Sequence, residues 1–151
     1  MDAIILGGGL AGLTLALQLR GACPDLDILV LERRRHPLPA AAHKVGESTV
    51  EIGAHYFAHT LGLREHLDSA HIRKFGLRYF FSDGRADIEN VTELGVSHLL
   101  PQPSYQIDRG LFETFLGEEA RRRGIDFRDG ATVGGLVVGE HGAAHEVRWR
   151  D

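Results

Sequence analysis

The chain begins with glycines spaced for binding a dinucleotide. Gly7, Gly9 and Gly12 form the pattern G-x-G-x-x-G directly after the apolar run DAIIL. In this pattern the first glycine permits a tight turn, the second lets a pyrophosphate approach the backbone, and the third lets a helix pack closely on a strand. We expect a helix to begin at Leu10 and Ala11, with the amides of its first turn directed at the phosphates.

A second apolar run, DILVLE, ends in an acidic residue that suits the same ligand. Glu32 lies twenty residues after Gly12, where a carboxylate would accept hydrogen bonds from the ribose hydroxyls of an adenosine. A carboxylate at this position would also repel a 2′-phosphate, so NADP is disfavoured, while NAD and FAD both remain open. Arg33 is a candidate for stacking on the adenine. The alternative is that the glycines serve only as turns.

Composition and charge indicate an ordinary folded domain. The 151 residues are 43% apolar and 25% charged, with a formal net charge of −4, so nothing attracts the chain to nucleic acid or to acidic membranes in general. One cysteine excludes an internal disulfide and suits a reducing compartment. There is no signal-peptide pattern and no apolar run of membrane-spanning length. We therefore expect a cytoplasmic protein without nucleic-acid or membrane partners.

The rest of the chain alternates helical and strand-like patterns. Ser48 or Thr49 is expected to cap a helix, since a hydroxyl can bond the free amides of a first turn. A short helix over residues 64–70 and one strand over residues 74–84 follow. Asp108 is expected to cap a longer helix that ends at Gly124. The apolar stripe of that helix would comprise Leu111, Phe112, Phe115, Leu116 and Ala120.

Three strand-like segments, IDFRDG, VGGLVV and HEVRWR, complete the chain. With the two strands near the N-terminus they predict an α/β, Rossmann-like fold that has a parallel sheet and additional antiparallel strands. Two parallel strands alone do not complete a dinucleotide fold. We therefore expect residues 1–151 to form one nucleotide-binding domain that is apparently truncated and is the first part of a larger enzyme.

The sequence resembles flavin-dependent halogenases and related FAD monooxygenases in three segments and one residue. These are GGGLAG, HKVGEST, YQIDRGLFETFL and the distal Glu32. The pattern is similar to the tryptophan-halogenase-like branch of the glutathione-reductase-type FAD fold. In that family a V-G-E-[AS]-T segment follows the first β-α-β unit and packs against the flavin, and a D-R-x-x-F-x-x-x-L helix comes later. The resemblance implies an FAD-binding domain, the N-terminal part of a flavoprotein whose substrate domain is absent from these residues.

The same resemblance assigns cofactor contacts outside the glycine loop. It implies that Lys44, Gly46, Glu47 and Ser48 lie near the flavin. Gly46 would allow close approach of the backbone, while Glu47 and Ser48 would offer hydrogen-bonding groups. Arg109 would support the cofactor from the later helix. The alternative is that GEST is a helix cap and nothing more.

Lys74 is the catalytic residue that the resemblance implies. Family halogenases carry a lysine ahead of a strand, as KFGLRYF does here. The resemblance implies that reduced flavin and oxygen give a C4a-hydroperoxide, that halide attacks it, and that this lysine holds the hypohalous acid near a small-molecule substrate by hydrogen bonding. A flavin reductase or NAD(P)H would supply the electrons. An exposed lysine before a strand is also common for structural reasons.

Other activities stay open at this stage. The chain could belong to a hydroxylating monooxygenase, to an FAD-dependent reductase or dehydrogenase of the geranylgeranyl-reductase type, or be an inactive truncated fragment that binds nucleotide weakly. The halogenase segment W-x-W-x-I-P is not in these residues. His55 and His59 have the spacing of a metal pair but no third ligand is indicated, so no metal site is expected.

Overall fold

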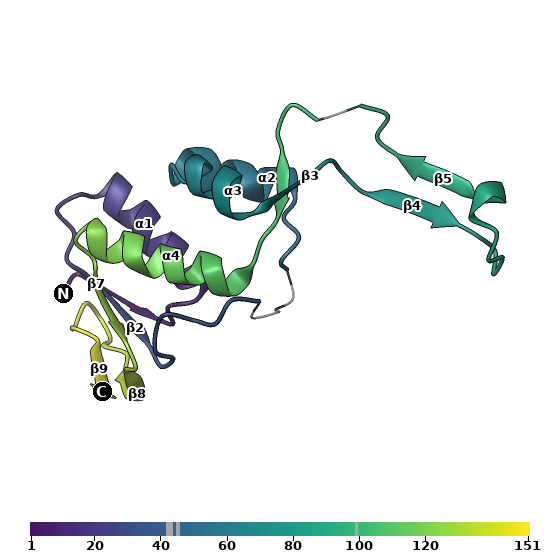
Figure 1. Ribbon diagram of the computed structural model, residues 1–151. Helices are drawn as coiled ribbons and strands as arrows, with labels where there is room; N and C mark the ends of the chain where they lie inside the picture. Colours follow the sequence, from purple (N-terminus) through teal and green to yellow (C-terminus); the bar gives the residue numbers. More distant parts are fainter. Residues whose placement is uncertain (42–43, 45, 99) are drawn as a thin grey trace. The chain divides into compact units, whose positions relative to one another are not determined.

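The computed structural model describes residues 1–41, 44, 46–98 and 100–151. The chain divides into two compact units. Unit 1 comprises Met1–Glu47 together with Asp108–Asp151, and unit 2 comprises Ser48–Ile107. Figure 1 labels the helices and strands of both units.

Unit 1 is built on three parallel strands: β1 (Ala3–Leu6), β2 (Ile28–Glu32) and β7 (Asp126–Asp129), in the order β1-β2-β7. Helix α1 (Leu10–Ala22) connects β1 to β2, and α4 (Arg109–Arg122) precedes β7. The predicted Rossmann-like α/β fold with a parallel sheet is therefore confirmed. The segment that forms β7 was expected to be a strand, and the structure adds that it pairs with β2 in parallel.

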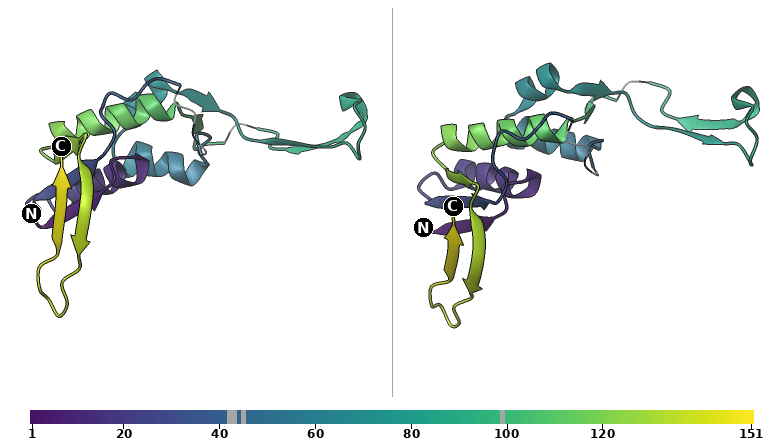
Figure 2. Two further views of the ribbon diagram at one scale, coloured as in Figure 1. Left: turned by 90° about the horizontal axis from the view of Figure 1, so that it is seen from below. Right: turned by 60° about the horizontal axis from the view of Figure 1, so that its bottom comes forward.

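Unit 1 has three layers. Successive side chains of a strand point to opposite faces of a sheet, and one face of β2 packs with Ala131 in a cluster that contains Leu29 and Leu31. Val133 and Val147, from β8 (Thr132–Val137) and β9 (Glu146–Arg150), pack against this cluster. Figure 2 shows this antiparallel hairpin on the side of the sheet away from α1 and α4. The expected antiparallel strands are thus present.

The turn between β1 and α1 is packed too tightly for side chains. Gly7 has a positive φ of 112°, a conformation that L residues rarely adopt. A Cβ atom built on Gly12 would lie 1.9 Å from the carbonyl oxygen of Gly7, far inside van der Waals contact. The close packing expected of Gly12 is therefore present, and it brings the first turn of α1 directly onto the glycine loop.

Helix α4 begins and ends largely as expected. The side chain of Asp108 caps it, because Oδ1 accepts a hydrogen bond from the amide of Leu111 at 3.0 Å. Gly124 follows its end with a φ of 75°. The buried stripe contains Phe112, Leu116 and Ala120. Leu111 was wrongly placed in that stripe: it is 43% exposed, since the first turn of the helix presents it to solvent.

Unit 2 contains α2 (Glu51–His55), the π-helical segment η1 (Tyr56–Thr60), α3 (Arg64–Ala70) and the antiparallel pair β3 (Ile72–Lys74) and β6 (Ser104–Gln106). The short helix expected over residues 64–70 is confirmed. Buried side chains fill the interior of unit 2, among them Phe57, Leu61, Leu67, Tyr105 and Ile107.

The predicted hydroxyl cap of the helix after KVGEST is wrong. Helix α2 begins after Val50, and no side chain caps it. The hydroxyl of Thr49 instead donates to the carbonyl of Tyr105 at 3.0 Å and accepts from its amide at 2.7 Å. Ser48 pairs with Gln106 in an isolated antiparallel β-bridge. Residues 48 and 49 thus continue the β3–β6 pairing, which the local sequence did not reveal.

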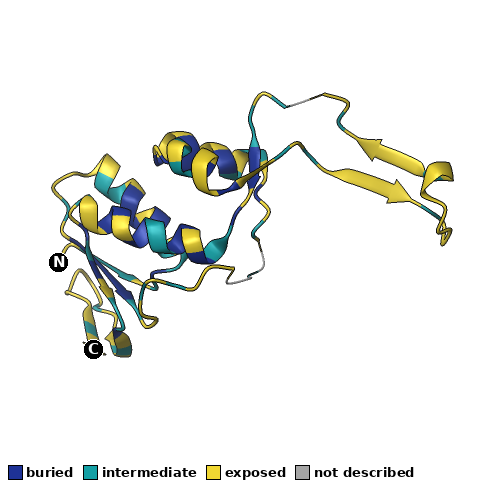
Figure 3. Cartoon of the chain, viewed as in Figure 1, coloured by how far each residue is buried: buried dark blue, intermediate teal, exposed yellow. Residues whose placement is uncertain are grey.

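The strand expected over residues 74–84 is interrupted. Gly76 has a φ of 109°, so β3 stops at Lys74 and a separate strand, β4 (Arg78–Phe81), follows. It pairs with β5 (Thr92–Gly95), and the 3₁₀ turn η2 (Ile88–Asn90) lies between them. Figure 3 shows both strands exposed along their whole length. Within the described ranges, no helix of the chain is long and apolar enough to cross a membrane.

Alanine at Gly12 should destabilise the chain by about 1–3 kcal/mol or more, because overpacking cannot be relieved when the obstacle is backbone. Urea unfolding followed by circular dichroism measures the change. Gly21→Ala is the matched control: it lies in the same helix with no atom within 4 Å of a built Cβ. It should stabilise by about 0.5–1 kcal/mol, since glycine is a poor helix former. Equal midpoints for the two variants would contradict this account of Gly12.

Candidate functional site

A cleft of about 330 Å³ lies in unit 1 beside the glycine loop. Gly8 and Gly9 contribute backbone to it. The charged side chains that line it are the cations Arg33, Arg34, Lys44 and Arg109 and the acids Glu32 and Glu113. The structure therefore collects around one cleft several residues that the sequence assigned to cofactor binding. Leu10, Ala11 and Gly12 form the first turn of α1 directly after Gly9.

Glu32 is bonded to the backbone of its own surroundings. One carboxylate oxygen accepts from the amide of Gly8 at 2.7 Å, and the other accepts from the amide of Arg34 at 2.8 Å. A carboxylate has about four acceptor positions, so these two bonds orient the group and leave capacity for a ligand hydroxyl. Arg33, beside it, is exposed at the cleft.

Gly8 is required by the fold although the glycine motif gives it no role. A Cβ atom there would lie 2.6 Å from a ring carbon of Phe127 and 2.7 Å from the Cβ atom of Glu32. Its conformation is ordinary, so the requirement is one of space and not of φ. The partner Phe127 lies on β7, far along the chain, which is why the local pattern did not indicate it.

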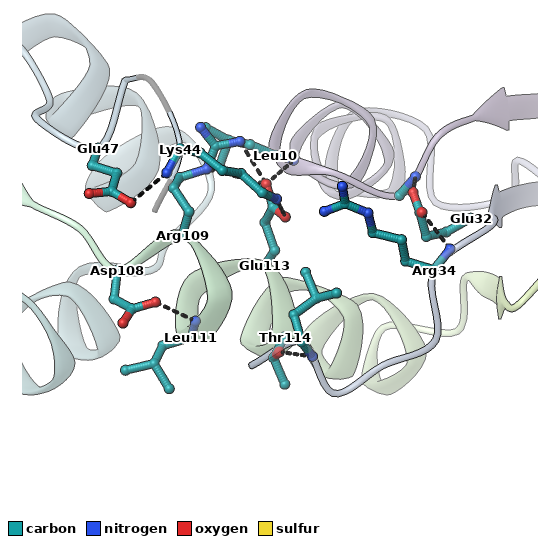
Figure 4. A network of polar contacts seen from close by, with 12 residues as sticks. Leu10, Glu32, Arg34, Lys44, Glu47, Asp108, Arg109, Leu111, Glu113 and Thr114 are labelled. Carbon is teal, nitrogen blue, oxygen red and sulfur yellow. Dashed lines mark hydrogen bonds and ion pairs between the residues drawn. The ribbon is translucent and has the colours of Figure 1, made fainter. Parts of the chain in front are cut away.

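Glu113 is the central residue of the cleft, and sequence reasoning missed it. Its side chain is 2% exposed. It accepts hydrogen bonds from the ammonium of Lys44, from the guanidinium of Arg109 at 2.6 Å, and from the amide of Leu10 at 3.2 Å. Figure 4 shows these contacts converging on one carboxylate. A signal was present: Glu113 lies four residues after Arg109 and three before Leu116, which places an acid on the buried stripe.

These contacts determine the charge state of Glu113. Burial by itself would raise the pKa of the carboxyl, but the hydrogen bonds from Lys44 and Arg109 outweigh it and hold the pKa below its usual value. The carboxylate is therefore ionised at neutral pH. It also bonds the first turn of α1, a position that favours negative charge.

The loop that carries the KVGEST segment is arranged by its own side chains. The backbone amide of Lys44 donates to the carboxylate of Glu47 at 2.8 Å, and Gly46 has a φ of 87°. Val45, which is part of the matching segment, lies outside the described residues. This part of the loop belongs to unit 1, with the glycine loop and Arg109.

Ser48 and Lys74 belong to unit 2 and lie together there. The ammonium of Lys74 donates to the hydroxyl of Ser48 at 2.5 Å and to the carbonyl of Thr49 at 2.8 Å. Lys74 is half-buried. The structure thus joins two of the residues singled out from the sequence, by a contact that their separation of 26 positions did not suggest.

Replacing Glu113 by glutamine should lower the free energy of unfolding by about 3 kcal/mol, since removing one partner of a buried ion pair leaves the other charges uncompensated. Glu118→Gln on the exposed side of α4 is the control and should change stability little. Urea unfolding at neutral pH gives both values. Equal losses of unfolding free energy in the two variants would show that the buried carboxylate stabilises the fold no more than an exposed one does.

The pH dependence should distinguish the same two variants. A carboxyl whose pKa is lower in the folded than in the unfolded chain stabilises the fold at pH values above its pKa in the unfolded chain. This contribution is lost as the pH falls through its pKa in the folded chain. The usual pKa of a glutamate carboxyl is 4.5. The free energy of unfolding of the unchanged chain should therefore fall more steeply than that of Glu113→Gln as the pH drops below this value. Parallel pH profiles would contradict the prediction.

The chain is similar to known proteins over most of its length. Residues 5–72 match the family of NAD(P)-binding Rossmann-like domains. The flavin-dependent halogenase chlA of Dictyostelium discoideum is 31% identical over 145 residues, covering 85% of this chain and 24% of that protein. The chain thus spans about a quarter of the length of the curated relative that it matches.

Solved structures give the same result. The myxobacterial chondrochloren halogenase CndH, described as a variant of FAD-dependent halogenases, is 28% identical with a TM-score of 0.76, over 99% of this chain and 33% of that one. The halogenase PltM, crystallised with phloroglucinol and FAD, is 18% identical with a TM-score of 0.74, over 99% of this chain and 31% of that one; this likeness concerns the fold alone. The resemblance inferred from the sequence is confirmed: over nearly its whole length this chain is similar to flavin-dependent halogenases.

Proposed function

We propose that this chain binds FAD and serves an oxidoreductase of the flavin-dependent halogenase type. The observation that carries the proposal is the cleft of unit 1, where a glycine loop that leads into α1 and four cationic side chains line one space. The similarity to CndH, an FAD-dependent halogenase, supports FAD as the dinucleotide.

The residues of the cleft fit the ADP half of FAD. We assign close approach of the pyrophosphate to Gly9, as its place in the glycine motif suggests. A Cβ atom there would meet only a carboxylate oxygen of Glu113, at an ordinary contact distance of 3.7 Å, so the fold itself does not require glycine at this position. Helix α1 begins at Leu10, Ala11 and Gly12, and a helix N-terminus favours phosphate; the amide of Leu10 already donates to Glu113, so the amides of Ala11 and Gly12 are the ones assigned to the ligand. Glu32 would accept from the ribose, and Arg33 would stack on the adenine.

Charge in the cleft is consistent with a pyrophosphate. Lys44 and Arg109 both bond Glu113, so two cations share one carboxylate, and the three groups carry one net positive charge. A phosphate could bond the outward N–H groups of the guanidinium and ammonium while the carboxylate holds both side chains in place. In this proposal Arg109 and Lys44 bind the cofactor and Glu113 positions them.

The segment after Lys44 would face the flavin. We assign backbone approach to Gly46 and hydrogen bonding to Glu47 and Ser48. Bound FAD would supply the oxygen chemistry, with electrons from a flavin reductase or NAD(P)H. Lys74 would hold the oxidised halide beside a small-molecule substrate, because an ammonium is a strong hydrogen-bond donor. Its bond to Ser48 would fix the orientation of the ammonium.

Gly9→Ala should weaken FAD binding by about tenfold or more, because a methyl group blocks approach of the pyrophosphate while the fold tolerates it. Titration of the 151-residue chain with FAD, followed by flavin fluorescence, measures this. Gly21→Ala is the control and should bind as the unchanged chain does. NAD in place of FAD tests which dinucleotide is preferred. An unchanged chain that shows no saturable FAD binding would overturn the proposal.

Lys74→Met should abolish halogenation without changing FAD affinity. The chain is incubated with FAD, NADH, a flavin reductase, chloride and phloroglucinol, and products are identified by mass spectrometry. Chlorinated product that requires Lys74 supports the proposed activity. Product that has gained one oxygen would indicate hydroxylation instead, and flavin turnover with neither product would favour a reductase. Chlorination that survives in Lys74→Met would refute the role given to this lysine.

A further inference from the structure

Unit 2 contains a second polar site, built on the β3–β6 pair. Lys74 of β3 lies directly opposite Ser104 of β6 in the antiparallel register, and opposed residues of such a pair present their side chains on one face. Gln106, two residues along the same strand, pairs with Ile72 on one side and bridges Ser48 on the other. The Lys74 side chain must therefore cross β6, over Ser104, to reach the hydroxyl of Ser48.

Ser104 carries the unusual feature of this site. The residue is 2% exposed, and its hydroxyl oxygen has no hydrogen-bond partner within the part of the chain that the structure describes. A buried polar group without a partner is costly and uncommon in folded proteins. The hydroxyl is thus a donor without an acceptor, next to an ammonium whose two protein partners are neutral oxygens.

A cavity of about 210 Å³ adjoins this pair. Lys74 and Ser104 line it together with Arg64 and Arg73, while Glu51 contributes one negative charge. Arg73 is neutralised by Asp68 at 2.9 Å, and Arg64 contacts the ring nitrogen of His59 at 2.6 Å. Lys74 and Arg64 therefore give the cavity a positive potential that Glu51 only partly offsets.

The other walls of the cavity are apolar. Phe75, Leu100, Pro101 and Pro103 line it. An inorganic anion would make no use of these walls, whereas an organic molecule with an acidic group would contact both parts. The size suits a small molecule, since pockets for drug-sized ligands are larger.

We propose that this cavity binds a small organic carboxylate, with the carboxylate bonded by Lys74, Arg64 and the hydroxyl of Ser104. The anion supplies the acceptor that Ser104 lacks once the lysine side chain moves aside. Phe75 and the prolines contact the apolar body of the ligand. The inference does not require bound flavin, because every group involved belongs to unit 2. It shares Lys74 with the proposed function, so a bound carboxylate would compete with the oxidised halide for that ammonium.

The test uses the full 151-residue chain without FAD and benzoate as the probe, with binding followed by NMR chemical-shift titration. Benzoate should bind saturably and about tenfold or more tightly than benzamide, its neutral analogue, because hydrogen bonds to a charged group are the stronger ones. Inorganic phosphate should compete poorly. Equal affinity for benzoate and benzamide, or no saturable binding of benzoate, would overturn the proposal.

Variants locate the binding. Ser104→Ala should weaken benzoate binding at least about fivefold while leaving the urea midpoint unchanged or higher, since it removes an unsatisfied hydroxyl. Lys74→Met should weaken binding in the same way. Arg78→Gln, on β4 and outside the cavity, removes a cation that pairs with Glu93 and should bind benzoate normally. If Ser104→Ala binds as tightly as the unchanged chain, or Arg78→Gln weakens binding equally, the proposed site is wrong.

Discussion

The buried carboxylate of Glu113 is the interaction on which the geometry of unit 1 depends most. A charge removed from water must be paired and hydrogen-bonded, and Glu113 meets that need with groups from three places: the start of α1, residue 44 and the first turn of α4. The carboxylate therefore fixes where the loop after β2 returns to the glycine loop. Without it, Lys44 and Arg109 would share no hydrogen-bond acceptor.

Features of the fold that depend on near neighbours in sequence could be predicted. The steric demand at Gly12 arises from Gly7, five residues away, and Asp108 caps its own helix through an amide three residues on. The order of strand, glycine loop, helix and acid likewise predicted the β1-α1-β2 unit with Glu32 at its end. In these cases the partner lies within the same motif, so residue type and spacing carry the information.

Features that depend on distant partners could not be read from the chain. Thr49 bonds the backbone of Tyr105, 56 residues away, and Glu113 bonds Lys44 and Leu10 across 69 and 103 residues. Thr49 as a helix cap was a sound local expectation, yet a long-range backbone pairing used the same hydroxyl. The acid on the stripe of α4 was visible in the sequence, but nothing local identified its partners.

The cleft of unit 1 and the cavity of unit 2 differ in the partners of their cationic side chains, and this difference affects which ligand each can bind. In unit 1 Lys44 and Arg109 already bond one carboxylate, so a ligand must compete for their remaining donors. Arg33 and Arg34 also line that cleft, and a multiply charged, hydrogen-bonding group such as a pyrophosphate gains most from such a set of cations. In unit 2 the ammonium of Lys74 is held by neutral oxygens. A single carboxylate can then replace those contacts without separating an ion pair. The first arrangement favours a dinucleotide and the second a small monoanion.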